Sequence, residues 1–152
     1  SPNTISYAGN VNFQIVTCSV LPRNLTVDLG DFPVSSFVSV GTLSSPAQNF
    51  DVTVNCNSTV QPEVKVTSSN GYETAFEGVL KLTQQTGMAT GVGVQMVFDN
   101  NIATFDTYVN TQREAVANET LAIPFQVRYE QISDVVTPGP ANTVATITLA
   151  YK

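Results

Sequence analysis

Residues 5–15 read ISYAGNVNFQI, and residues 145–152 read ATITLAYK. In both stretches apolar residues recur at every second position, which is the period of a β-strand with one buried face. The odd-numbered positions carry Ile5, Tyr7, Gly9, Val11, Phe13 and Ile15 in the first stretch, and Ala145, Ile147, Leu149 and Tyr151 in the second. Both stretches are therefore predicted to be strands that bury one face.

The whole chain has the composition of a β protein. Its 152 residues include 22 Val, 6 Ile and 19 Thr, and β-branched residues favour pleated, half-buried surfaces. Strand-like runs are predicted at 5–15, 24–29, 50–56, 63–67, 79–82, 91–98, 121–129 and 143–151. Residues 111–118 have the spacing of a capping box but are too short for a stable helix, so we predict a loop there. Short strands at this spacing predict a single sandwich or barrel domain.

The N-terminal stretch is too long for one ordinary strand, because eleven residues would span about 36 Å and strands usually have five or six residues. We expect a break near Gly9, and with it an extension of residues 1–10 followed by a domain of residues 11–152. The C-terminal strand has an apolar face and an edge for which no residue after Lys152 supplies a partner. Such an edge normally has to be covered.

Charge and composition exclude several classes of function. The net charge of −6 and the pI near 4.3 oppose binding to a phosphate backbone, so no nucleic-acid partner is expected. The chain has no His, which removes Ser-His-Asp and Cys-His nucleophile systems and His-ligated zinc. No catalytic residue, cofactor or metal site is predicted. Asp99, Asn100, Asn101 and Asp106 carry oxygens that suit calcium, but their spacing fits no EF-hand, and we predict a hairpin turn.

Cys18 and Cys56 are the only cysteines, and each lies in a strand-like pattern. One disulfide in an oxidising compartment is the simplest interpretation, and two buried free thiols are the alternative. The chain begins at Ser1 without Met, and we interpret it as a mature form whose signal peptide has been removed. Sequons for N-glycosylation occur at Asn24, Asn57 and Asn118, as expected by coincidence in a chain rich in Asn and Thr.

Eight stretches carry a family resemblance. They are 5–15 with Gly9, 18–20 (CSV), 26–30 (TVDLG), 50–56, 91–95 (GVGVQ), 123–129 (IPFQVRY), 137–142 (TPGPAN) and 145–152 with the penultimate Tyr151. None is diagnostic alone. Together, and in this order, they resemble the pilins of the chaperone/usher pathway, the type 1 and P fimbrial subunits of Gram-negative bacteria.

The resemblance implies an all-β fold, an incomplete immunoglobulin-like sandwich of six strands that a strand from a neighbouring subunit completes. It implies a donor strand containing Ile5, Tyr7, Gly9, Val11 and Phe13, and a groove beside the C-terminal strand with Ala145, Ile147, Leu149, Tyr151 and Lys152. The implied partners are neighbouring pilins in an extracellular fimbrium, a periplasmic chaperone that holds the Lys152 carboxylate, and an outer-membrane usher. Addition of a strand to a sheet edge is a general mode of recognition, for which pilins are a standard example.

Three alternatives stay open at the level of sequence. The N-terminal stretch could fold back onto its own domain as an ordinary first strand. The protein could instead be a single-domain fimbrial adhesin that binds a host receptor, or a self-contained secreted β-sandwich of lectin type. The aromatic residues Tyr72, Phe105 and Tyr108 could form a carbohydrate platform or pack against a neighbouring subunit.

Overall fold

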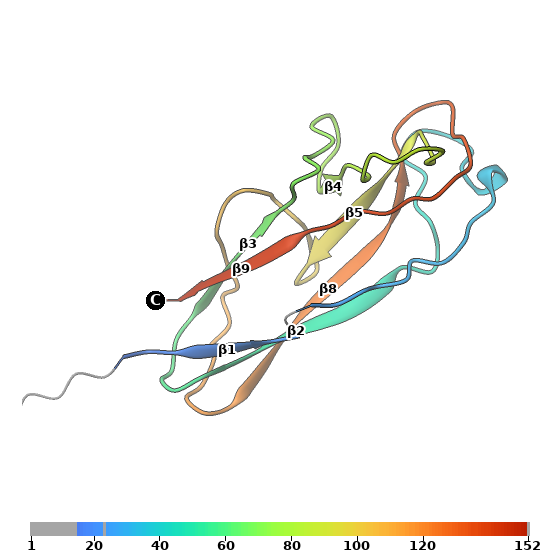
Figure 1. The fold of residues 1–152 in the computed structure, drawn as a ribbon. Helices are drawn as coiled ribbons and strands as arrows, with labels where there is room; N and C mark the ends of the chain where they lie inside the picture. Colours follow the sequence, from blue (N-terminus) through green and yellow to red (C-terminus); the bar gives the residue numbers. More distant parts are fainter. Residues whose placement is uncertain (1–14, 23, 152) are drawn as a thin grey trace, which may run out of the picture.

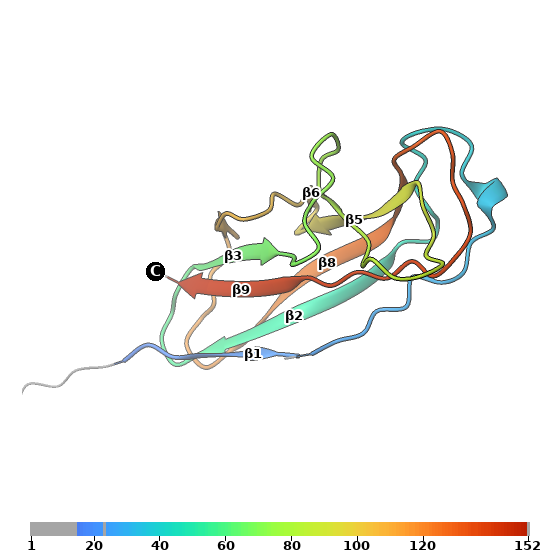
Figure 2. The same ribbon diagram turned by 45° about the horizontal axis from the view of Figure 1, so that its top comes forward.

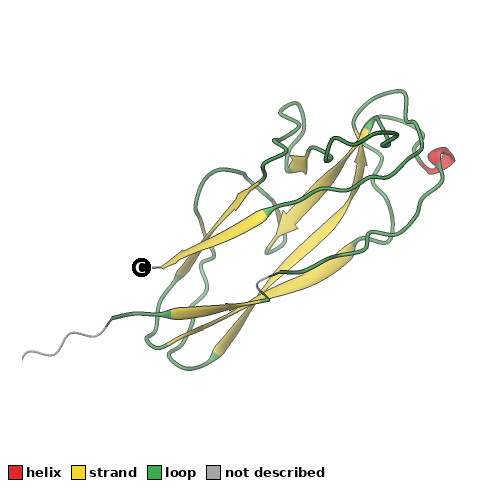
Figure 3. Ribbon diagram, viewed as in Figure 1, coloured by secondary structure: helices red, strands yellow, loops and turns green. Residues whose placement is uncertain are grey.

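The structure is a computed structural model that describes residues 15–22 and 24–151. Within these residues the chain forms nine strands and one short 3-10 turn (Figure 3). The strands are β1 (Cys18–Leu21), β2 (Gln48–Cys56), β3 (Pro62–Thr67), β4 (Val79–Leu80), β5 (Val92–Phe98), β6 (Asn101–Ile102), β7 (Val109–Asn110), β8 (Thr120–Gln131) and β9 (Thr146–Tyr151), and the 3-10 turn is η1 (Val34–Ser36). The prediction of an all-β protein is confirmed.

The strands form two antiparallel sheets (Figures 1 and 2). The first has the order β1-β2-β8-β5-β4, with β6 added to β5, and the second has the order β7-β3-β9. Six strands have four or more residues, which matches the number expected for the incomplete sandwich. The other three, β4, β6 and β7, have two residues each and extend sheet edges.

The core lies between the sheets and follows the period-two pattern of the sequence. Alternate residues of the central strands are buried, among them Val54 in β2, Val64 in β3, and Ile123 and Phe125 in β8. The Phe125 ring stacks on that of Phe50, with centroids 5.2 Å apart. Burial of each such side chain contributes about 1.5–3 kcal/mol.

A disulfide joins Cys18 to Cys56, so the expected pairing is confirmed. These two residues are also opposite each other in the register of β1 and β2. The bond therefore fixes β1 on the edge of the first sheet, next to the point where the chain enters the domain.

The structure corrects one predicted strand. Residues 24–29 alternate like a strand, but they pair with no strand of the described chain and are not a strand themselves. β1 (Cys18–Leu21), in contrast, has no separate run among those predicted. Residues 111–118 contain no helix, as predicted, and Ala115 forms a bridge to Val60.

Candidate functional site

β1 and β9 are outer strands of different sheets, and each pairs along one edge only within residues 15–22 and 24–151. β1 pairs with β2 and β9 pairs with β3, both in antiparallel register. A free strand edge exposes a row of N–H and C=O groups that can pair with another chain. The second edge of β9 is therefore a candidate site for strand addition.

A groove runs along this side of the sandwich. Its larger hollow has a volume of about 850 Å³ and is lined by residues 24–29 on one wall and residues 141–145 on the other. A second hollow of about 350 Å³ continues it and is lined mainly by residues 30–34 and 136–142. The two hollows share Asp28, Tyr129, Ala141 and Asn142, so they are parts of one groove.

The core is incompletely covered along this side. Val20, Val27, Leu29, Ile147 and Leu149 all pack against the buried core, yet each remains only half-buried. Full burial of these side chains would require another apolar strand over them. The groove is thus suited to an added strand, because half-buried apolar side chains line the core beneath it and the second edge of β9 offers backbone groups for pairing.

Hydrogen bonds hold the wall that precedes β9 in place. The Asn70 Nδ2 donates to Thr83 Oγ1 at 2.9 Å and to Thr143 Oγ1 at 3.2 Å. The backbone N–H of Thr83 donates to the Asn142 carbonyl at 2.6 Å, and Ser68 Oγ donates to the Val144 carbonyl at 2.7 Å. These bonds tie residues 142–144 to the loops that follow β3 and β4, and they anchor this wall of the groove to the body of the domain.

Tyr129 lies at the junction of the two hollows. Its hydroxyl donates to the Ala141 carbonyl at 2.7 Å, and its ring meets that of Phe32 edge to face, with centroids 6.0 Å apart. Burial raises the pKa of the Tyr129 hydroxyl, and the nearby Asp28 and Asp31 raise it further. The hydroxyl therefore stays protonated at neutral pH and remains a donor to the groove wall.

The chain is also fixed where it enters β1. Asn57 Nδ2 donates to the Ile15 carbonyl at 2.8 Å, and the Thr17 N–H donates to Asn57 Oδ1 at 2.9 Å. The Tyr151 hydroxyl, at the end of β9, donates to the Val16 carbonyl at 2.8 Å. The side chains of Asn57 and Tyr151 thus hold three consecutive residues, 15–17. We call this set of three hydrogen bonds the Asn57 clamp.

One of the predicted site residues, Ala145, lines the groove, and three others belong to the strand that follows this wall. Ile147, Leu149 and Tyr151 belong to β9, and Ala145 lies just before it in the wall of the larger hollow. The predicted donor residues Ile5, Tyr7, Gly9, Val11 and Phe13, together with Lys152, lie outside the described residues. The sequence analysis did not identify the wall at 24–29, Tyr129 or Asn70 as site residues. Asn57 was noted in the sequence only as part of a glycosylation sequon, which does not indicate its contacts with residues 15 and 17.

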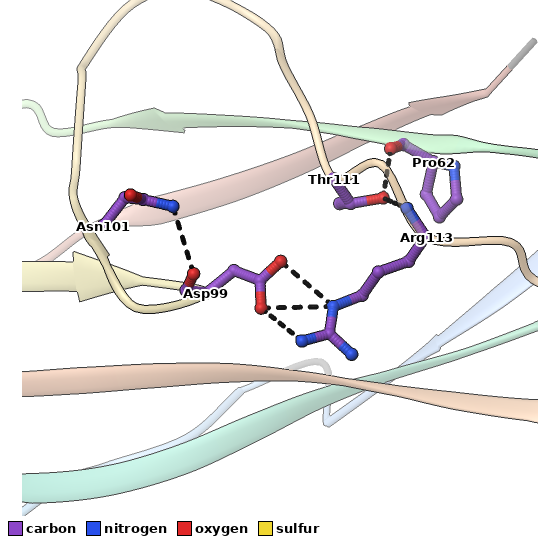
Figure 4. Close-up of polar contacts among 5 residues, drawn as sticks. All are labelled: Pro62, Asp99, Asn101, Thr111 and Arg113. Carbon is purple, nitrogen blue, oxygen red and sulfur yellow. Dashed lines mark hydrogen bonds and ion pairs between the residues drawn. The ribbon is translucent and has the colours of Figure 1, made fainter.

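The candidate calcium site has a structural explanation. The Asp99-Asn100 pair forms the turn between β5 and β6, with φ values of 50° and 68°, which confirms the predicted hairpin. The Asp99 carboxylate accepts hydrogen bonds from Arg113 Nε at 3.0 and 3.1 Å (Figure 4), so an arginine engages both carboxylate oxygens of Asp99, one of the four residues considered for calcium. Within the described residues, no group of three or more His, Cys, Asp or Glu side chains is placed to hold a metal.

The aromatic residues do not form a free platform. The Tyr72 and Phe105 rings stack on each other at 4.5 Å between centroids, and the Lys65 ammonium lies 4.9 Å above the Tyr108 ring. The faces that a sugar ring would need are therefore partly taken by neighbours. The described residues also contain no helix that is long and apolar enough to cross a membrane.

Comparison with known proteins agrees with this geometry. The family model for fimbrial proteins matches residues 5–152. A type 1 fimbrial subunit of Salmonella typhimurium is 24% identical over 153 residues, covering 98% of this chain and 82% of the relative. The crystal structure of the P pilus rod subunit PapA superposes with a TM-score of 0.66 at 16% identity, over 89% of this chain and 99% of PapA. A subunit of a chaperone-usher pilus studied for rod uncoiling gives a TM-score of 0.66 at 17% identity over all of both chains. These two structures share the fold.

Proposed function

The chain belongs to the fimbrial protein family, and from this premise we propose that it is a structural subunit of a bacterial surface fibre that polymerises by donor-strand exchange. The N-terminal stretch of one copy would fill the groove of the next. The donor would present Ile5, Tyr7, Gly9, Val11 and Phe13, and the acceptor would present Ala145, Ile147, Leu149, Tyr151 and Lys152. Residues 1–10 would then belong wholly to the extension that serves another copy, and the domain of residues 11–152 would begin with the last two donor residues, Val11 and Phe13.

The observation that carries this proposal is the groove with its unpaired β9 edge. An occupant must supply both a backbone ladder and alternating apolar side chains, because the edge has polar groups to satisfy and the floor has half-buried apolar groups to cover. Residues 5–15 have this alternation.

The energetics favour a durable contact. Burial of Ile5, Tyr7, Val11 and Phe13 at about 1.5–3 kcal/mol each gives about 6–12 kcal/mol before any backbone hydrogen bond is counted. Ordering a previously free segment offsets part of this gain. Because donor and acceptor are different surfaces, the contact is heterologous and extends into an open filament rather than a closed dimer.

Assembly requires a groove that is protected until a neighbouring subunit arrives. We assign this protection to a periplasmic chaperone that donates a strand and binds the Lys152 carboxylate, and the exchange itself to an outer-membrane usher. The family membership and the exposed β9 edge support both assignments. The rival function of a lectin-like binding module lacks support from the aromatic side chains, since neighbours take one face of each of these rings.

The test is a pair of charge-matched variants of the full chain. Val11→Asp places a carboxylate on the apolar face of the donor, and Asn12→Asp places the same charge on its polar face. We expect Val11→Asp to abolish fibre formation, as seen by electron microscopy and by ladders of detergent-resistant oligomers, and Asn12→Asp to leave it intact. Equal assembly of the two variants would refute the proposal.

A further inference from the structure

Six of the twelve large apolar side chains that are exposed among the described residues lie at the two ends of the sandwich. At one end, which we call the loop pole, lie Val34, Val38 and Val40 around η1 and Val135 after β8, with exposed fractions of 37%, 80%, 45% and 67%. At the other end, the entry pole, lie Ile15 (77%) and Val116 (43%). Figure 1 shows these regions at opposite ends: η1 and the loop after β8 lie far from the end of β9, and the first described residues and the loop before β8 lie close to it.

The direction of an incoming strand follows from the sheets. Every strand pair in both sheets is antiparallel, so a strand added to β9 is expected to run against it. Its N-terminal part then lies beside Tyr151, and its C-terminal part lies beside residues 136–142. The donor chain therefore leaves the groove at the loop pole.

Beyond that point, very little chain separates the donor strand from the folded body of the donor copy. Only Gln14 separates Phe13, the last donor residue, from Ile15, where the Asn57 clamp begins. Two residue steps span at most about 7 Å. Because the clamp holds residues 15–17 to the body of the donor copy, its entry pole must stand directly over the acceptor's loop pole.

We propose that the loop pole of one copy and the entry pole of the next form a second, apolar contact. It lies beside the contact between the groove and the N-terminal donor stretch of residues 1–14, which we call the arm. Val38 and Val135 of the acceptor would pack against Ile15 and Val116 of the donor copy. The inference rests on the proposed function, since the arm brings the poles together. The contact is heterologous, so it repeats along the fibre and leaves one unpaired apolar pole at each end.

The experiment uses a dimer in which one copy can act only as the acceptor and the other only as the donor. The acceptor is a full chain whose arm is inactivated by Ile5→Asp and Val11→Asp, and the donor is a full chain whose groove is filled with a synthetic peptide of residues 1–14. Dissociation of the mixed dimer is followed by surface plasmon resonance. Binding of the same peptide alone to the acceptor is measured in parallel, because it reports the groove without the poles.

Val38→Ser with Val135→Ser in the acceptor is expected to speed dissociation of the dimer about tenfold or more, which corresponds to about 1.4 kcal/mol, and to leave peptide binding unchanged. Val116→Ser is an internal control, because it should weaken the dimer when the donor carries it and have no effect when the acceptor carries it. Equal dissociation of all variants would overturn the proposed contact between the two poles. Failure of the unmodified peptide to bind the groove would instead refute the proposed function.

Discussion

Asn70 offers a direct test of whether the groove wall is built in advance. Its side-chain amide makes the hydrogen bonds to Thr83 and Thr143 that anchor the wall before β9, and Asn70→Ala removes both. At about 0.5–1.5 kcal/mol for each bond, the free energy of unfolding should fall by about 1–3 kcal/mol. Asn49→Ala is the matched control, because Asn49 accepts one hydrogen bond from Gln126 on the exposed face and does not reach the groove.

The assay is guanidinium unfolding with and without excess arm peptide of residues 1–14. A peptide that binds only the folded chain raises stability by RT ln(1 + [L]/Kd), so the increase reports affinity independently of the baseline stability. For Asn70→Ala we expect a smaller peptide-induced increase than for the wild type, and for Asn49→Ala an unchanged one. If Asn70→Ala lowers the baseline but keeps the full increase, the wall does not depend on this network and the reasoning is wrong.

Three further perturbations have distinct expected sizes. Replacing Cys18 and Cys56 by Ala should cost about 4 kcal/mol of unfolding free energy, from the loop of 38 residues that the disulfide closes, and thermal unfolding measures it. Burial raises the pKa of the Glu130 carboxyl because it disfavours the charged form. The stability that the protonated carboxyl allows is therefore fully present below the ordinary pKa of Glu and is lost as pH rises through the raised pKa. Glu130→Gln should therefore stabilise the protein at neutral pH and flatten the pH profile of guanidinium midpoints; a wild-type profile in the variant would contradict this. Arg113→Gln should leave the guanidinium midpoint almost unchanged, because the Arg113 side chain is 40% exposed in its pair with Asp99 and solvent screens the pair.

The sequence predicted those elements in which side-chain alternation and backbone pairing coincide. Residues 50–56, 63–67 and 121–129 alternate, and each belongs to a strand with neighbours in its sheet. Residues 24–29 alternate equally well and form no strand, because alternation reports which face is buried and not whether a partner edge exists. That difference is itself informative, since this segment forms a wall of the groove.

The site was less predictable than the fold. The edge of β9 followed from the C-terminal pattern, but the groove wall depends on hydrogen bonds between residues more than 60 positions apart, such as Ser68 with Val144. The Tyr129 hydroxyl reaches the Ala141 carbonyl, which is only 12 positions away but lies beyond the end of β8. Polar contacts of this kind leave no periodic trace in a single sequence, and only the folded chain reveals them.

The Asn57 clamp bears on the choice of host for making this protein. Asn57 is the acceptor of a sequon, and its Nδ2 atom, to which an oligosaccharide would be attached, already donates to the Ile15 carbonyl. A secretory pathway that installs sugars on such sites would place a bulky branch at the root of the arm. Protein made in yeast or mammalian cells should therefore carry a sugar on the Asn57 clamp. Thr59→Ala would remove the sequon and leave the Asn57 side-chain amide unchanged.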